Sequence, residues 1–158
     1  MNKLKPNGFT LIEILVVVAI VGILVTIVVS NFVGIRINAR DARRKAELAQ
    51  IQKALELYKS DQSPQAYPAT GFNDTFFCNQ CWSQGGIGIC TGNIYMPKFP
   101  CDPQYINPSP YIFKIDESDN FKYFLSACIE NTEDPDKDDS AISECADIGK
   151  RSYTVREP

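Results

Sequence analysis

The feature that most constrains this chain is an apolar run from Phe9 to Ile35, in which Glu13 is the only ionisable side chain. As a helix with a rise of ~1.5 Å per residue, the run would be roughly 40 Å long, which is enough to cross a hydrocarbon core of ~30 Å. Lys3 and Lys5 precede it, and such a basic flank keeps an N-terminus cytoplasmic. The sequence therefore predicts one membrane-spanning helix, with the remainder of the chain exported.

The residues in front of this run do not form an ordinary secretory signal. Such a signal has an apolar core of about 7–15 residues that ends at a small-residue cleavage site. Here the small residue, Gly8, comes before the apolar run, at the end of a short polar segment with two lysines. We therefore interpret residues 1–8 as a separate leader peptide.

Helix signals continue after the apolar run, because residues 36–60 contain no proline and no glycine. Their apolar side chains recur at spacings of three and four and predict a stripe of ordinary core, formed by Leu48, Ile51, Leu55 and Tyr58. The helix should end near Ser60–Pro64, since proline cannot continue it. We expect one helix over Phe9–Lys59, with a membrane-spanning half at 9–35 and an amphipathic half at 36–60.

A basic cluster, Arg36–Lys45, follows the apolar run directly. We interpret it as a helix face that is solvated or contacts lipid headgroups. Opposite charges four residues apart, Asp41 with Lys45 and Arg43 with Glu47, are placed to pair on the helix surface.

Three segments have strand character. Tyr111–Ile115 and Phe121–Ile129 flank a turn-like segment at 116–120, and Arg151–Val155 is the third. A small antiparallel sheet that covers the stripe of the helix is the simplest way to bury both apolar faces. The predicted fold is therefore α+β, with a long N-terminal helix packed against a small antiparallel sheet, and residues 61–158 form an exported globular head.

Charge is divided unevenly along the chain. Residues 1–65 carry nine Lys or Arg against five Asp or Glu, whereas residues 66–158 carry seven against fourteen. The sequence does not combine a basic patch with interleaved aromatic residues, so no dedicated nucleic-acid site is evident. It has no histidine, which removes the commonest general base and metal ligand. We expect no enzymatic activity.

Residues 66–110 hold six of the ten prolines and five of the nine glycines, and we expect loops with little regular structure there. All six cysteines follow the membrane signal, at Cys78, Cys81, Cys90, Cys101, Cys128 and Cys145. An even number there indicates disulfides in an oxidising compartment. We expect Cys128 and Cys145 to pair around the acidic loop Thr132–Glu144. The first four have the spacing C-x2-C-x8-C-x10-C; we expect disulfides of open connectivity, with a zinc site or a thioredoxin-like redox site as alternatives.

The motif that points to a function is Gly-Phe-Thr-Leu-Ile-Glu at residues 8–13, between the basic leader and the apolar run. It resembles the class III signal of bacterial type IV pilins and type II secretion pseudopilins. The resemblance implies a pilin-like fold, cleavage between Gly8 and Phe9 by a membrane prepilin peptidase, and methylation of the new Phe9 amine. It also implies that many copies polymerise by packing their apolar helices into a filament core.

Glu13 is an isolated carboxylate in a lipid-spanning run, where an ionisable group costs a few kcal/mol and is a functional candidate by default. Its obvious partner is the Phe9 ammonium of a neighbouring subunit, which exists only after cleavage. This ion pair would set the register of one subunit on the next. The alternative is an interfacial carboxylate that reaches the membrane surface.

Beyond the helix, the segments Phe99–Pro103, Pro110–Tyr111 and Tyr123–Ala127, followed by Glu130–Asn131, are similar to the major pseudopilin and related pilins. In that family a Leu-Pro-x-Asp-Pro segment precedes a short meander that ends in Leu-Glu-Asn. Cys101 and Cys128 of the present chain replace ordinary residues of that pattern.

The acidic loop contains four closely spaced carboxylates, Asp134, Asp136, Asp138 and Asp139. It is not an EF-hand, because Asp139 replaces the required glycine and Cys145 stands at the twelfth position. Major pseudopilins carry a calcium site in their C-terminal loop, so the resemblance implies calcium at these aspartates. The alternative is a solvated acidic loop, and we expect no other cofactor.

We interpret the chain as the prepilin of a type IV pilus-like filament. The alternative is a pseudopilin of a type II secretion or DNA-uptake system. The implied partners are further copies of the chain, the prepilin peptidase and methyltransferase, an inner-membrane assembly platform and, before assembly, the membrane. The N-terminus would be cytoplasmic and the head exported, in an extracellular or periplasmic filament.

Overall fold

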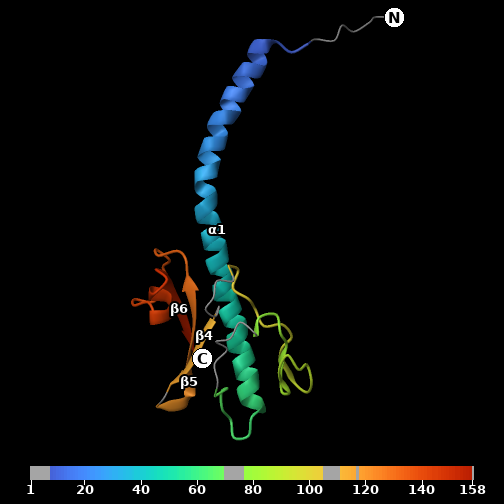
Figure 1. Cartoon of the computed structure of the whole chain (residues 1–158), viewed down its shortest axis with the longest axis vertical. Helices are drawn as coiled ribbons and strands as arrows, with labels where there is room; N and C mark the ends of the chain where they lie inside the picture. The colour runs from blue at the N-terminus through green and yellow to red at the C-terminus, as the bar shows by residue number, and fades with distance from the viewer. Residues whose placement is uncertain (1–7, 70–76, 105–110, 117, 158) are drawn as a thin grey trace, which may run out of the picture. The chain divides into compact units, whose positions relative to one another are not determined.

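Figure 1 shows the chain as a computed structural model. The structure describes residues 8–69, 77–104, 111–116 and 118–157, without the side chains of residues 27–31 and 120. The chain divides into two compact units, Met1–Arg36 and Ile37–Pro158. We describe each unit by itself.

Helix α1 covers Leu11–Asp61, close to the predicted Phe9–Lys59, and Pro64 follows its end. In the first unit its large apolar side chains are exposed in the single chain; Leu11 is 83% and Ile12 69% accessible. Among the residues that the structure describes, no helix combines the length and apolar character that a membrane crossing requires.

The second unit contains the predicted antiparallel sheet. Strands β4 (Tyr111–Asp116), β5 (Asp119–Ile129) and β6 (Arg151–Arg156) pair in the order β4-β5-β6. Leu125, at the centre of β5, pairs with Phe113 on one side and with Val155 on the other. This arrangement confirms the α+β class and the helix-on-sheet packing.

The core of the second unit lies along the second half of α1. Leu48, Ile51 and Leu55 are completely buried and belong to one cluster with the inward-facing residues of the sheet, Tyr111, Phe113, Tyr123 and Leu125. The stripe is therefore core, as predicted, except that Tyr58 is only partly buried at the edge of the cluster.

The segment 77–104 is more ordered than the sequence suggests. It contains a small sheet of β1 (Trp82–Ser83), β2 (Gly86–Ile87) and β3 (Ile94–Met96) in the order β2-β1-β3. Strands of two or three residues are too short to show the alternation that reveals a strand. This sheet packs on α1 through its aromatic residues: Trp82 stacks on Tyr58, with ring centroids 5.4 Å apart. In Figure 1 this segment and the β4-β5-β6 sheet flank the second half of α1.

Candidate functional site

The first candidate site is the start of α1, where a capping box orders the motif. The backbone N–H and the hydroxyl of Thr10 both donate to Glu13 Oε2 at 2.8 Å, and the Glu13 N–H donates to Thr10 Oγ1 at 3.3 Å. These bonds satisfy helix N–H groups that otherwise have no partner. Glu13 therefore has a local role that the filament interpretation does not include. The spacing Thr-x-x-Glu encodes it and could have revealed it.

Gly8 and Phe9 lie just outside the helix and are exposed. A Cβ added at Gly8 would meet no atom within 4 Å. The fold of the chain itself therefore does not require glycine at this position. A requirement for glycine would have to come from a molecule that binds this segment.

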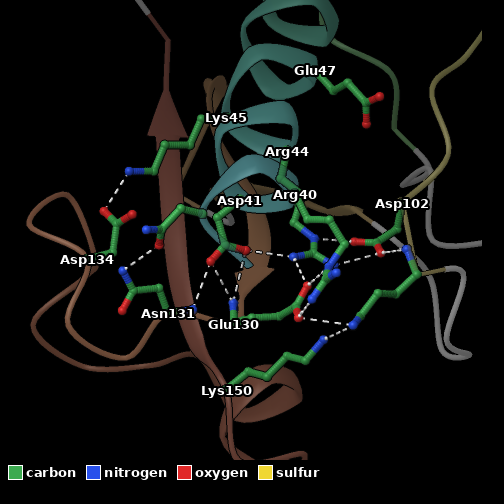
Figure 2. A network of polar contacts seen from close by, with 12 residues as sticks. Arg40, Asp41, Arg44, Lys45, Glu47, Asp102, Glu130, Asn131, Asp134 and Lys150 are labelled. Carbon is green, nitrogen blue, oxygen red and sulfur yellow. Dashed lines mark hydrogen bonds and ion pairs between the residues drawn. The ribbon is translucent and has the colours of Figure 1, made fainter. Parts of the chain in front are cut away.

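The second candidate site is a buried ionic network centred on Arg44, shown in Figure 2. The Arg44 side chain is completely buried. It forms a two-pronged contact with Asp102, Nε to Oδ2 at 2.6 Å and Nη2 to Oδ1 at 2.9 Å. Its Nη1 donates to Asp41 at 2.6 Å and to Glu130 at 2.7 Å. One arginine on α1 thus binds three carboxylates from three segments of the chain.

The carboxylates of the network have further donors. Asp41 accepts the backbone N–H of Glu130 at 3.0 Å and of Asn131 at 2.8 Å. Glu130 also accepts from Nε of Arg40 at 2.7 Å and from Nη2 of the same residue. These bonds hold the end of β5 on α1. Charge-assisted and bidentate bonds of this kind are among the stronger hydrogen bonds in proteins, and here they connect segments that lie far apart in the sequence.

Burial and charge act in opposite directions on these groups. Hydrogen bonds from Arg40 lower the pKa of Glu130, burial raises it, and hydrogen bonds from Arg44 lower it further. Together these effects lower the pKa of Glu130 to about 2. Burial alone would raise the pKa of Asp102, but the Arg44 guanidinium and the Gln104 N–H outweigh burial and lower it. Both groups are therefore anionic at neutral pH.

The network corrects the interpretation of the basic cluster as a solvated or lipid-facing surface. Arg44 is buried, and Asp41 pairs with Arg44 instead of Lys45; only the Arg43–Glu47 pair forms as predicted, at 2.7 Å. A sequence signal was present, because the core stripe continues backwards at helical spacing from Leu48 through Arg44 to Asp41. The acceptors Asp102 and Glu130 lie in two of the pseudopilin-like segments of the sequence, Phe99–Pro103 and Glu130–Asn131.

All six cysteines pair in the structure. The disulfides join Cys78 to Cys101, Cys81 to Cys90, and Cys128 to Cys145. The last pair is the one expected around the acidic loop. No cysteine is left free, so neither a four-thiolate zinc site nor a dithiol formed by Cys78 and Cys81 is present in this arrangement.

The four aspartates of the acidic loop do not converge on one point. Asp134 and Asp136 bind the ammonium of Lys45 at 2.5 and 2.8 Å, and Asp138 accepts the hydroxyls of β6. Among the described residues, no group of three or more acidic or cysteine side chains could hold a metal ion. The end of the loop enters the four-residue helix α2, Ser143–Ala146, which was not predicted.

Comparisons with known proteins agree with the motif at the start of α1. Residues 3–29 match the family model of the prokaryotic N-terminal methylation motif. The chain is similar to type II secretion system core protein G of Vibrio cholerae, 41% identical over 109 residues that cover 66% of the chain and 73% of that protein. The Pseudomonas aeruginosa protein of the same name is 34% identical over 121 residues, which cover 71% of the chain and 77% of that protein.

The similarity to the Aeromonas hydrophila protein of that name, 37% over 70 residues, spans about half (48%) of that relative's length. No solved structure matches the chain. The methylation motif lies at the start of α1, and the two longer matches extend well beyond it. The chain therefore belongs to the family of type IV pilins and type II secretion pseudopilins.

Proposed function

We propose that this chain is the precursor of a structural filament subunit, and that the filament is the pseudopilus of a type II secretion system. The observation that carries the proposal is the methylation motif over residues 3–29, followed by similarity to core protein G over more than two thirds of two relatives. The role is structural and not enzymatic.

In this proposal a prepilin peptidase cleaves the chain between Gly8 and Phe9, and the new amine of Phe9 is methylated. The exposure of both residues ahead of α1 supports access by such an enzyme. Glycine allows a scissile backbone to lie close against a protein surface. Since the fold leaves room at Gly8, this close approach is the physical reason for a glycine there.

The exposed apolar side chains of residues 9–26 support the polymerisation step. An uncovered apolar surface of this kind marks a membrane or protein contact. We propose that the membrane covers it before assembly, with the N-terminus cytoplasmic and the head exported, and that other copies cover it in the filament. The single-pass topology stays a prediction. The proposed partners are further subunits, the processing enzyme and an inner-membrane assembly platform.

A surface-exposed type IV pilus is the second candidate. The observation that favours it is the set of three disulfides, because cross-links protect a small head outside the cell. In this case the filament would be extracellular instead of periplasmic.

Deletion of the gene tests the proposal and separates the two candidates. We expect deletion to abolish secretion of proteins into the medium and to leave surface appendages unchanged in electron micrographs. Loss of appendages with normal secretion would favour the pilus. N-terminal mass spectrometry should find methylated Phe9 at the start of the exported protein, and Gly8→Val should leave the precursor uncut. A mature protein that begins at Met1 would contradict both candidates.

A further inference from the structure

The acidic loop binds an unexpected cation, the side chain of Lys45 from α1, which Figure 2 shows directed at Asp134. Its Nζ lies 2.5 Å from Asp134 Oδ1 and 2.8 Å from Asp136 Oδ2. The Lys45 and Asp134 side chains are 19% and 12% exposed, whereas that of Asp136 is 63% exposed. The ammonium also lies 5.2 Å from the centre of the Tyr153 ring on β6, at cation–π distance. Lys45 thus contacts both the loop and the sheet.

The remaining contacts of the loop fix the two carboxylates around this lysine. Asp134 Oδ1 also accepts the N–H of Asp136 at 2.9 Å, which forms a tight turn that presents both carboxylates to one point. Asp138 is directed elsewhere, because its Oδ2 accepts the hydroxyls of Ser152 at 2.5 Å and Thr154 at 2.7 Å.

These residues, as arranged, do not fit a calcium ion. Calcium takes about six to eight oxygen ligands, whereas only two of the four aspartates, Asp134 and Asp136, contact the same point. The Lys45 ammonium already occupies that point and would repel a second cation. Burial opposes the charge on Lys45, but the bonds to Asp134 and Asp136 outweigh burial and raise the pKa of Lys45.

We propose that the Lys45 ammonium takes the place of a metal ion in this chain, so that the C-terminal loop is ordered without calcium. The lysine belongs to α1, next to Arg44 of the buried network. Its neutralising charge is therefore present whenever the chain is folded, whatever the ion concentration, whereas the stabilisation by a bound ion depends on the free ion concentration relative to Kd. This inference is independent of the proposed filament role.

Thermal unfolding of the full-length, disulfide-bonded chain in non-ionic detergent tests the proposal. The wild type should have the same Tm in calcium as in the calcium chelator EGTA. Lys45→Met should lower the Tm in EGTA by at least about 3 °C, because two carboxylates then repel each other. Calcium, but not magnesium, should restore much of the loss, since the position of the ammonium is then open to a large cation that can complete its shell with backbone carbonyls and water beside the two carboxylates. Lys53→Met, at an exposed lysine of the same helix, is the matched control and should behave as wild type.

Three results would overturn the proposal. The first is a wild-type Tm that rises in calcium over EGTA, which needs no variant to be measured. The second is a Lys45→Met protein as stable in EGTA as the Lys53→Met control. The third is a destabilised Lys45→Met protein whose Tm does not change with calcium. If that variant does not fold, calorimetric titration of the wild type with calcium decides, because the proposal requires no binding heat.

Discussion

At the residue scale, Arg44 is the group with the most demanding environment. Moving an ion of this kind out of water costs several kcal/mol, which only close counter-charges and satisfied hydrogen bonds offset. Here Arg40 and Arg44 face three carboxylates, those of Asp41, Asp102 and Glu130. The network joins α1 to the segments that carry Asp102 and Glu130. Such a buried network adds little net stability when it forms, but removal of one partner is strongly destabilising.

Replacement of Arg44 should therefore be severe. Arg44→Met leaves three carboxylates with one arginine, and we expect a loss of about 3–5 kcal/mol in the free energy of unfolding. Urea denaturation of the disulfide-bonded protein measures it. Arg43→Met is the matched control, because Arg43 is 60% exposed and its surface pair is worth at most about 1 kcal/mol. Equal losses in the two variants would show that the network contributes no more than a surface pair.

Glu130 makes stability depend on pH. Its pKa is lowered from 4.5 to about 2 in the folded chain, so its contribution is complete above the unfolded pKa and is lost as pH falls toward 2. We expect the Tm of the wild type to fall between about pH 4.5 and 2, and Glu130→Gln to reduce that fall. Asp102 acts in the same direction.

Tm measurements from pH 6 to pH 2 test the assignment. Glu133→Gln is the control, since that side chain is 87% exposed, and it should retain the full pH dependence. A Glu130→Gln protein with an unchanged acid transition would assign the pH dependence to other carboxylates.

At the scale of single elements, α1 has two kinds of surface. Its first half carries exposed apolar side chains, whereas its second half buries a line of residues that runs from Asp41 through Arg44, Leu48 and Ile51 to Leu55. The buried line is ionic at its start and apolar after it. It therefore binds the loops through charge and the sheets through packing.

The disulfide Cys128–Cys145 connects the end of β5 to α2 around the acidic loop. In the chain-entropy model, a disulfide that closes a loop of this length stabilises the folded state by about 3 kcal/mol. We expect the double variant Cys128→Ser/Cys145→Ser to lose about that much in urea denaturation and to lose hydrogen-exchange protection in residues 132–144. Cys81→Ser/Cys90→Ser is the control and should leave exchange in that loop unchanged. Loop protection that survives in the first variant would mean that Lys45 and β6 suffice to hold the loop.

At the scale of the whole molecule, the two units differ in what can stabilise them. Ile37–Pro158 contains its own buried core. The described apolar side chains of Met1–Arg36 are exposed in the single chain, and in the proposed function lipid or other copies of the chain cover them. That proposal makes assembly a property of the first unit, with Glu13 as the candidate for directing it.

Glu13→Gln tests that role more sharply than removal of the side chain. Glutamine can keep the capping box with Thr10 but has no charge for the Phe9 ammonium of a neighbour. We expect normal cleavage, and a filament yield at least about tenfold lower, equivalent to about 1.4 kcal/mol. Thr10→Ala is the control, because it removes the cap hydroxyl and keeps the carboxylate. Normal filament yield from Glu13→Gln would refute the ion pair.

The sequence alone determined the features that depend on local pattern. Helical periodicity and Pro64 placed the end of α1 within two residues, and segments of strand character, two of them around a turn-like segment, placed the three strands of the main sheet. The motif at residues 8–13 identified the family. These predictions succeeded because each depends on residues that are neighbours along the chain.

Only the tertiary structure decided which charges and cysteines meet. Arg44 binds Asp102 and Glu130, which are 58 and 86 positions away. Lys45 binds Asp134, 89 positions away, and not its helical neighbour Asp41. In the sequence, each lysine or arginine has several possible acidic partners, and each cysteine has several possible cysteine partners. Packing of the sheet and loops on α1 selects among them, because a charge that loses its water binds the counter-charges that the fold brings to it.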